Sequence, residues 1–124
     1  MKKISDKISL IPLSNIKAQY RQSISINDEA SNFTYTSCST VQFSQDPEDT
    51  DSGLKYNITH ISVCNKQEVM AYNNKKAVAR MFLMNRDTVY IGTTDIPCRV
   101  IVTPAQGSLY KVEIKVSLPY PLDL

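Results

Sequence analysis

The sequence predicts an all-β protein: a single antiparallel sandwich or barrel of about six or seven strands, with at most one short helix near residues 66–72. Short runs rich in Val, Ile, Thr, Tyr and Phe recur along the chain, separated by Gly, Pro, Asn and Asp, as strands and turns require. In the run "SLYKVEIKVSLP", apolar and polar residues alternate strictly, which indicates a strand with one buried face. The apolar positions are Tyr110, Val112, Ile114, Val116 and Leu118, and the polar positions are Lys111, Glu113, Lys115 and Ser117.

The composition favours one soluble domain. A chain of 124 residues, 42% of them hydrophobic, has the size of a single β domain spanning residues 1–124. Its 14 basic and 12 acidic residues give a formal charge of +2, which disfavours a nucleic-acid partner. The sequence lacks an apolar run long enough to cross a membrane, and Asp6 and Lys7 interrupt the apolar core that a signal peptide needs. A cytoplasmic protein without a membrane partner is expected.

The two ends of the chain and a stretch near its start give further expectations. Residues 1–14 and 119–124 show no periodicity, so they are expected to be flexible arms. The stretch "AQYRQSISI" alternates and is predicted to form one strand. Its buried side would carry Ala18, Tyr20, Ile24 and Ile26, and its solvated side Gln19, Arg21, Ser23 and Ser25.

A long hairpin is expected between residues 31 and 64. Its two arms would be joined by the polar loop "QDPEDTDSG", which contains the Pro, Asp and Gly that turns favour. In the second arm the apolar positions change from Leu54, Tyr56 and Ile58 to Ile61 and Val63. A shift of one residue predicts a β-bulge near His60.

A helical turn is predicted for "NKQEVMAY". Asn65 would cap its start, Glu68 would fold back as in a capping box, and Asn73 and Asn74 would end it.

The last 48 residues are predicted to form three or four hairpin-linked strands. "AVARMFLM" and "TVYIG" would be joined by a tight turn at "NRD". Gly92 would end the second of these strands, and "TTDIP" would make a corner before the strand "CRVIVT". The turn "PAQG" would then lead into the final alternating strand.

The candidate reactive residues are better explained as turn and core residues. The loop residues Asp46, Glu48, Asp49 and Asp51 offer oxygen ligands that suit calcium, but their spacing fails the EF-hand pattern, so a solvated turn is favoured. His60, the single histidine, has Cys64 four residues later, which makes neither a zinc site nor a Cys–His nucleophile pair. The other cysteines, Cys38 and Cys98, are widely spaced, so all three are expected to be free thiols in a reducing compartment.

One further constellation surrounds the corner in "RDTVYIGTTDIPCRV". Arg86, Asp87 and Asp95 could gather around Cys98, but both aspartates stand where turns favour Asp, and a small thiol packs well at the start of a strand. Phosphate-loop, nucleophile-elbow and metalloprotease motifs are absent from the sequence. We therefore predict a protein that is not an enzyme, with no catalytic, cofactor-binding or metal site and no cofactor.

Residues 77–118 resemble small all-β proteins encoded in the tail and head-to-tail structural modules of phages and prophages. The matching positions are Gly92, Thr93, Asp95 and Pro97, in a strand–corner–strand arrangement followed by the long final strand. The resemblance implies an assembly protein that associates with itself and with other structural proteins through sheet edges and arms, as a phage or prophage tail or neck component. The alternatives are a small ligand- or carbohydrate-binding β-domain that uses exposed tyrosines in a cleft, and a calcium-dependent module.

Overall fold

The alternating runs of the sequence form antiparallel strands in the computed structural model, which describes residues 3–20, 23–122 and 124. Ten strands and three short 3₁₀ helices lie within these residues. The strands are β1 (Ile4–Pro12), β2 (Ile16–Tyr20), β3 (Ser23–Ile26), β4 (Phe33–Thr36), β5 (Gln42–Thr50), β6 (Gly53–Cys64), β7 (Lys75–Leu83), β8 (Thr88–Ile91), β9 (Cys98–Pro104) and β10 (Tyr110–Leu118). The 3₁₀ helices are η1 (Leu13–Asn15), η2 (Glu29–Ser31) and η3 (Gln67–Tyr72).

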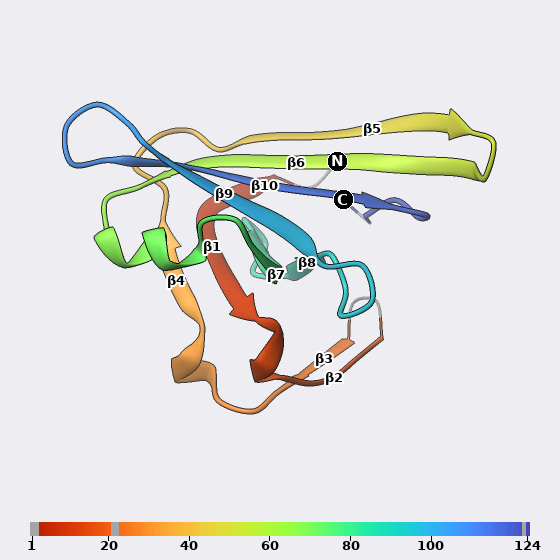
Figure 1. Ribbon diagram of the computed structural model, residues 1–124, viewed down its shortest axis with the longest axis horizontal. Coiled ribbons are helices and arrows are strands. Elements are labelled where there is room, and N and C mark those ends of the chain that lie inside the picture. The colour runs from red at the N-terminus through yellow and green to blue at the C-terminus, as the bar shows by residue number, and fades with distance from the viewer. Residues whose placement is uncertain (1–2, 21–22, 123) are drawn as a thin grey trace.

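The main sheet is curled into a half-barrel. Its strands follow the order β4-β1-β7-β9-β10-β6-β5, and β8 pairs with β7 beside this path (Figure 1). The predicted all-β class is confirmed, although the strands outnumber the six or seven expected because β1, β4 and the β2–β3 pair were not foreseen as separate strands.

The inner face of the half-barrel holds the larger hydrophobic core. Because side chains alternate between the two faces of a strand, every second residue of each long strand points inward. The largest fully buried apolar side chains of this core are Ile8, Leu10, Ile58, Val69, Met81, Ile91, Val100, Ile114 and Leu118.

A smaller core lies on the outer face. Ile11, Val78 and Tyr90 are buried there, and they come from β1, β7 and β8. The β2–β3 pair contributes Ile16, Ile24 and Ile26, and Leu13 completes the cluster. The two short strands therefore shield one part of the outer face.

The predicted N-terminal arm is wrong for residues 4–12, which form β1 between β4 and β7. Ile8, Leu10 and Ile11 are completely buried. The run lacks strand alternation because Ile8 and Leu10 face the inner core, whereas Ile11 faces the outer one.

The predicted C-terminal arm is also wrong where the structure describes it. Leu122 packs into the inner core with 4% of its surface exposed. Its backbone N–H donates to Oε1 of Gln45 over 2.7 Å, so the tail is fastened to β5.

The single strand expected for "AQYRQSISI" is in fact two strands, β2 and β3, which pair with each other. Ile24 and Ile26 are half-buried as predicted, but Ala18 and Tyr20 are exposed, Tyr20 to 78%. Gln19 takes the more buried position in β2, and its Nε2 donates to the Gly92 carbonyl over 3.2 Å. The predicted solvated residue Arg21 lies outside the described residues.

The hairpin of β5 and β6 spans Gln42–Cys64, because the first part of the arm expected from residue 31 is β4, which pairs with β1. Most of the expected loop is strand: β5 runs to Thr50, and Thr50 pairs with Gly53 across a two-residue turn. The bulge near His60 is also wrong, because β6 pairs with β10 in one unbroken register from Tyr56 to Cys64. His60 and Ser62 therefore point into the core, while Ile61 and Val63 lie half-exposed on the outer face.

The short helix near residues 66–72 is confirmed as η3, but the predicted capping box is wrong. Lys66 occupies the N-cap position, and its side chain makes no capping hydrogen bond. Asn73 ends the helix as expected, and Asn74 follows with a left-handed φ of 61°.

Two of the predicted C-terminal hairpins are confirmed: β7 with β8, and β9 with β10. By contrast, β8 and β9 do not form a hairpin with each other. Both pair with the same edge of β7, where Ile91 lies opposite Ala79 and Cys98 lies opposite Ala77. Residues 92–97 thus form a corner that leaves the edge of β7 and returns to it.

Candidate protein-binding site

Strands near opposite edges of the sheet approach each other at one end of the half-barrel. The hydroxyl of Tyr35 on β4 lies 2.6 Å from the hydroxyl of Ser62 on β6. Immediately after β4, the Cys38 N–H donates to the Val63 carbonyl over 2.8 Å, and the Val63 N–H donates to Oγ of Ser37 over 3.0 Å. This end is therefore closed by hydrogen bonds between segments far apart in the sequence.

Next to this closure the sheet is open, because the first residues of β1 leave the regular ladder. Ile4 lies opposite Leu83 and Ile8 opposite Met81, so β1 has two more residues than β7 in this interval and bulges. Pairing with β4 starts at Lys7. Beyond it the Ser37 N–H donates to the Asp6 carbonyl over 2.7 Å, and among the described residues no strand pairs with Ile4 or Ser5 on that side.

A groove of about 480 Å³ lies at this open end. Its walls come from three segments: the start of β1, the start of β5 and the residue that follows β7. The lining residues are Lys3, Ile4, Ser5, Asp6, Val41, Phe43 and Met84. Met84 is 65% exposed, whereas Ile4 and Phe43 also pack against the inner core. The groove therefore offers apolar side chains beside two strand edges.

The edge of β5 is unevenly protected. Within the part of the chain that the structure describes, β5 pairs with β6 alone. Its far half carries Asp46, Pro47, Glu48 and Asp49, and charges and proline on an edge strand oppose pairing with another chain. Residues 39–45, which adjoin the groove, contain neither a charge nor a proline. This neutral segment is the part of the edge open to a further strand.

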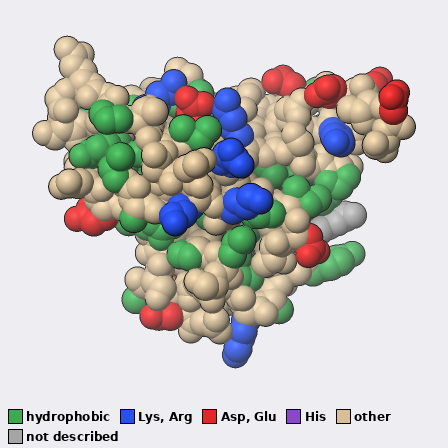
Figure 2. Space-filling model, viewed as in Figure 1, with side chains coloured by type: hydrophobic (Ala, Val, Ile, Leu, Met, Phe, Trp, Pro, Cys, Tyr) green, Lys and Arg blue, Asp and Glu red, His purple; other side chains and the backbone are tan. Residues whose placement is uncertain are grey.

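The outer face carries a second uncovered surface. Lys76, Arg99 and Lys115 lie directly opposite one another on β7, β9 and β10. Glu113 lies beside this row, and its carboxylate accepts from Nζ of Lys111 at 3.0 Å and from Nζ of Lys115 at 3.4 Å. The hydrogen bond from Lys111 is the main reason that the pKa of Glu113 is lowered. Several Lys and Arg side chains lie close together in the middle of the molecular surface shown in Figure 2.

The predicted reactive residues do not form one site. Cys98 is buried at the start of β9, where its thiol donates to the Ala77 carbonyl over 2.9 Å, and burial raises its pKa to about 12. Asp87 closes the turn before β8 through a hydrogen bond from its N–H to Oδ1 of Asn85. Asp95 is exposed in the corner that follows β8, so β8 separates it from Arg86 and Asp87.

His60 is buried on the inner face between Phe43 of β5 and Ile114 of β10. Burial lowers its pKa to about 4, with a smaller opposing effect of its own backbone. Neither ring nitrogen has a hydrogen-bond partner of good geometry among the residues that the structure describes. The imidazole is therefore neutral near pH 7.

The acidic residues expected in a loop are distributed along β5 and its turn. Asp46 and Glu48 alternate with Pro47 and Asp49 between the two faces of the strand. Oε2 of Glu48 accepts from Nδ2 of Asn57 over 2.7 Å. Over residues 3–20, 23–122 and 124, no three His, Cys, Asp or Glu side chains gather closely enough to hold a metal ion.

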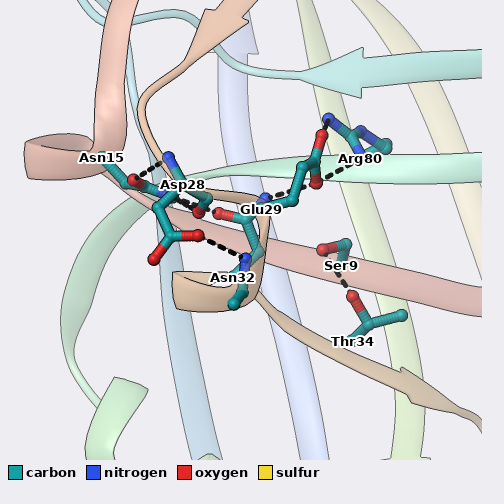
Figure 3. Close-up of polar contacts among 8 residues, drawn as sticks. Ser9, Asn15, Asp28, Glu29, Asn32, Thr34 and Arg80 are labelled. Carbon is teal, nitrogen blue, oxygen red and sulfur yellow. Dashed lines mark hydrogen bonds and ion pairs between the residues drawn. The ribbon is translucent and has the colours of Figure 1, made fainter.

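A polar cluster that the sequence did not reveal fastens residues 27–32 to the sheet (Figure 3). Arg80 on β7 makes two hydrogen bonds to the Glu29 carboxylate, at 3.3 and 3.2 Å. Nδ2 of Asn15 donates to the Asp28 carbonyl and to Oδ1 of Asn32, both over 2.7 Å. These bonds join neighbouring segments of the same chain, so the cluster stabilises the fold.

Comparison of the chain with protein-family models, with curated proteins and with solved structures gave no match. In the described part of the chain, no helix has the length and apolar character needed to cross a bilayer. The site is therefore interpreted from its own geometry.

Proposed function

We propose that this protein is a non-enzymatic assembly protein that associates with a second copy of itself through the open edge of the half-barrel. The observation that supports this is the groove between Lys3–Asp6 and Val41–Phe43, where an uncharged strand edge adjoins apolar side chains. An exposed edge accepts another strand through main-chain hydrogen bonds, and side-chain pockets add specificity.

The neutral segment suits two-fold pairing. If residues 39–45 of two copies pair antiparallel about Phe43, then Val41 lies opposite Gln45 and Asp46 lies opposite Thr40. The acidic residues of the two copies then do not face each other. Met84 and Ile4 lie next to this edge and would be covered on association.

Self-association of this kind is consistent with the structural role implied by the resemblance to phage and prophage tail or neck components. The alternative, a carbohydrate-binding cleft, requires tyrosines gathered on one concave surface. Tyr20 and Tyr72, however, line separate hollows. The assembly proposal is therefore favoured.

The experiment is light scattering of the purified chain over a range of concentrations. At about 0.5 M salt, where contacts between charged surfaces are screened, we expect the mass to rise from that of one 14.0 kDa chain towards that of a dimer. Met84→Lys should weaken this association by placing a charge at the groove. Met70→Lys, the same change at a residue that is 36% exposed on η3, should leave it unaltered. A monomer at every concentration, or equal effects of the two substitutions, would contradict the proposal.

A further inference from the structure

The end of the β5–β6 hairpin extends beyond the sheet (Figure 1). Pairing between β6 and β10 extends from Cys64 back to Tyr56, which lies opposite Leu118. Beyond this point β5 and β6 pair only with each other, as in the pairs of Glu48 with Lys55 and Asp49 with Leu54, within the described residues. We refer to residues 46–55 as the acidic tip.

The acidic tip combines negative charge with an exposed apolar side chain. Its anionic residues are Asp46, Glu48, Asp49 and Asp51, and its one cationic residue is Lys55. Leu54 is 44% exposed and lies opposite Asp49. Figure 2 shows Asp and Glu side chains at this end of the molecule.

The outer face of β7, β9, β10 and β6 has the complementary character. We refer to its charged and aliphatic outward-facing residues as the basic face: Lys76, Arg99, Lys111, Lys115, Glu113, Ile61, Val63 and Ile101. Four of these residues are cationic and one is anionic. The three aliphatic residues are half-exposed, and Ile101 and Ile61 lie on either side of Glu113.

The arrangement of the cations is unfavourable for the isolated chain. Neighbouring strands lie about 4.8 Å apart, and like charges in directly opposed positions repel each other. Lys76, Arg99 and Lys115 occupy three such positions in a row. Glu113 is bonded to Lys111 and Lys115, and within the described residues Lys76 and Arg99 have no ion pair. An anionic partner would relieve this repulsion.

We propose that the acidic tip of one copy docks on the basic face of a second copy. Opposite charges match across this contact, and Leu54 of the tip would pack against the half-exposed Ile61 of the face. Within one chain the tip cannot reach this face, because both lie along the paired strand β6 and the tip points away from the face (Figure 1). The contact is therefore intermolecular.

Such a contact joins two different surfaces, so each copy retains one free tip or one free face. Repetition of a head-to-tail contact produces a ring if the rotation closes and a filament if it does not. The proposal goes beyond the groove-mediated dimer, because it concerns a different surface and gives oligomers larger than two. The two contacts can therefore be tested separately.

The test uses charge reversal on each surface. A tip variant carries Asp49→Lys and Asp51→Lys, and a face variant carries Arg99→Glu and Lys115→Glu. Light scattering at low salt should show that each variant alone loses the larger oligomers, with at least about a tenfold increase in apparent Kd. An equimolar mixture should form a complex, because each variant retains one native surface. Combining all four substitutions in one chain should restore the large oligomers.

Matched controls separate this contact from net charge and from the groove. Lys17→Glu with Arg86→Glu makes the same chemical changes as the face variant at exposed positions elsewhere, and should not alter association. Met84→Lys should leave the tip–face contact intact. About 0.5 M salt should weaken it, because screening shortens the range of these interactions. Circular dichroism verifies that each variant is folded.

Three outcomes would overturn the proposal. The first is that the wild-type chain forms nothing larger than a dimer at low salt. The second is that the control pair of substitutions weakens association as much as the face variant. The third is that the chain with all four reversals is folded but does not recover the large oligomers. A different result would assign the basic face to another partner. In that case the wild-type chain binds a polyanion, the face variant does not, and the tip variant forms the same oligomers as the wild type.

Discussion

His60 makes the stability of this protein dependent on pH. Its folded-state pKa of about 4 is below the 6.5 of an unperturbed imidazole, because burial disfavours the charged form. Between these two values the unfolded chain binds a proton that the folded chain excludes. The contribution of the neutral His60 imidazole to stability is therefore fully present above pH 6.5. It decreases as the pH falls from 6.5 towards 4, and below pH 4 the titration of His60 causes no further change.

The expected loss in the free energy of unfolding is up to about 3 kcal/mol. Urea unfolding at pH 7.5, 6 and 5 measures it, since carboxylates stay largely ionised in this interval. His60→Leu should abolish most of the dependence. Glu113→Gln is the control, because the lowered pKa of Glu113 affects stability only at lower pH. An unchanged slope in His60→Leu would refute this account of His60.

Gly92 is a residue whose backbone and surroundings both exclude a side chain. Its φ is +89°, and a Cβ there would lie 2.9 Å from the Cys98 backbone nitrogen. Gly107 has a φ of +74° but nothing within 4 Å of the same position. Gly107→Ala should therefore cost about 1 kcal/mol from backbone strain alone, and Gly92→Ala about 2–3 kcal/mol. Thermal unfolding measures both variants. Equal losses would show that the corner of residues 92–97 relaxes to admit a methyl group.

At the residue scale, local turn chemistry could be predicted from the sequence. Asn85–Asp87 close a turn, Gly92 ends a strand, and Cys98 is a buried thiol. His60 could not be placed, because a buried polar side chain breaks the apolar pattern in the same way as a bulge does. The environment that tolerates a neutral imidazole is supplied by β5 and β10, which are distant in the sequence.

At the scale of elements, alternation predicted strands with one solvated face, whereas of the strands with two covered faces β7 was predicted as an apolar run before a turn and β1 was missed. β10 alternates because its outer face is open. β1 has buried residues on both faces, so its sequence lacks that signature. The C-terminal tail has no periodicity at all, since it is held by a side chain of β5 and by the packing of Leu122.

The tail should therefore contribute to stability. Leu122→Ala removes a side chain that is 4% exposed, and should lower the free energy of unfolding by about 2 kcal/mol or more. Leu54→Ala is the matched control at a side chain that is 44% exposed, and should cost less than about 0.5 kcal/mol. Urea unfolding at a low protein concentration separates these effects from association. Similar losses in the two variants would show that the tail is not part of the core.

At the scale of the whole molecule, the strand order explains why the candidate site was hidden. The groove requires the start of β1 and the start of β5 to lie together, although about 40 residues separate them along the chain. The basic face likewise depends on the register of β7, β9 and β10. Periodicity predicts that strands exist, but the pairing of distant strands depends on packing that one sequence does not reveal.

The last prediction concerns the buried hydrogen bond that helps to close the half-barrel. The hydroxyls of Tyr35 and Ser62 join β4 to β6, which lie near opposite ends of the strand order. Both residues are buried, so loss of one partner leaves the other hydroxyl without a hydrogen bond. Tyr35→Phe should therefore lower the free energy of unfolding by about 1–2 kcal/mol, and adding Ser62→Ala should cost little more. Hydrogen exchange of the Cys38 amide, which donates to Val63, should accelerate in Tyr35→Phe.

The pair of Thr34 and Ser9 provides the control for this cycle. Oγ1 of Thr34 donates to Oγ of Ser9 over 2.9 Å, but it joins β4 to β1, which are already paired through their backbones. Thr34→Val with Ser9→Ala should thus show a smaller coupling energy than the Tyr35–Ser62 pair, and should not accelerate exchange at Cys38. If the two cycles give equal coupling and Cys38 exchanges at the wild-type rate in Tyr35→Phe, the backbone bonds at residues 37–38 close the half-barrel without help from the buried hydroxyls.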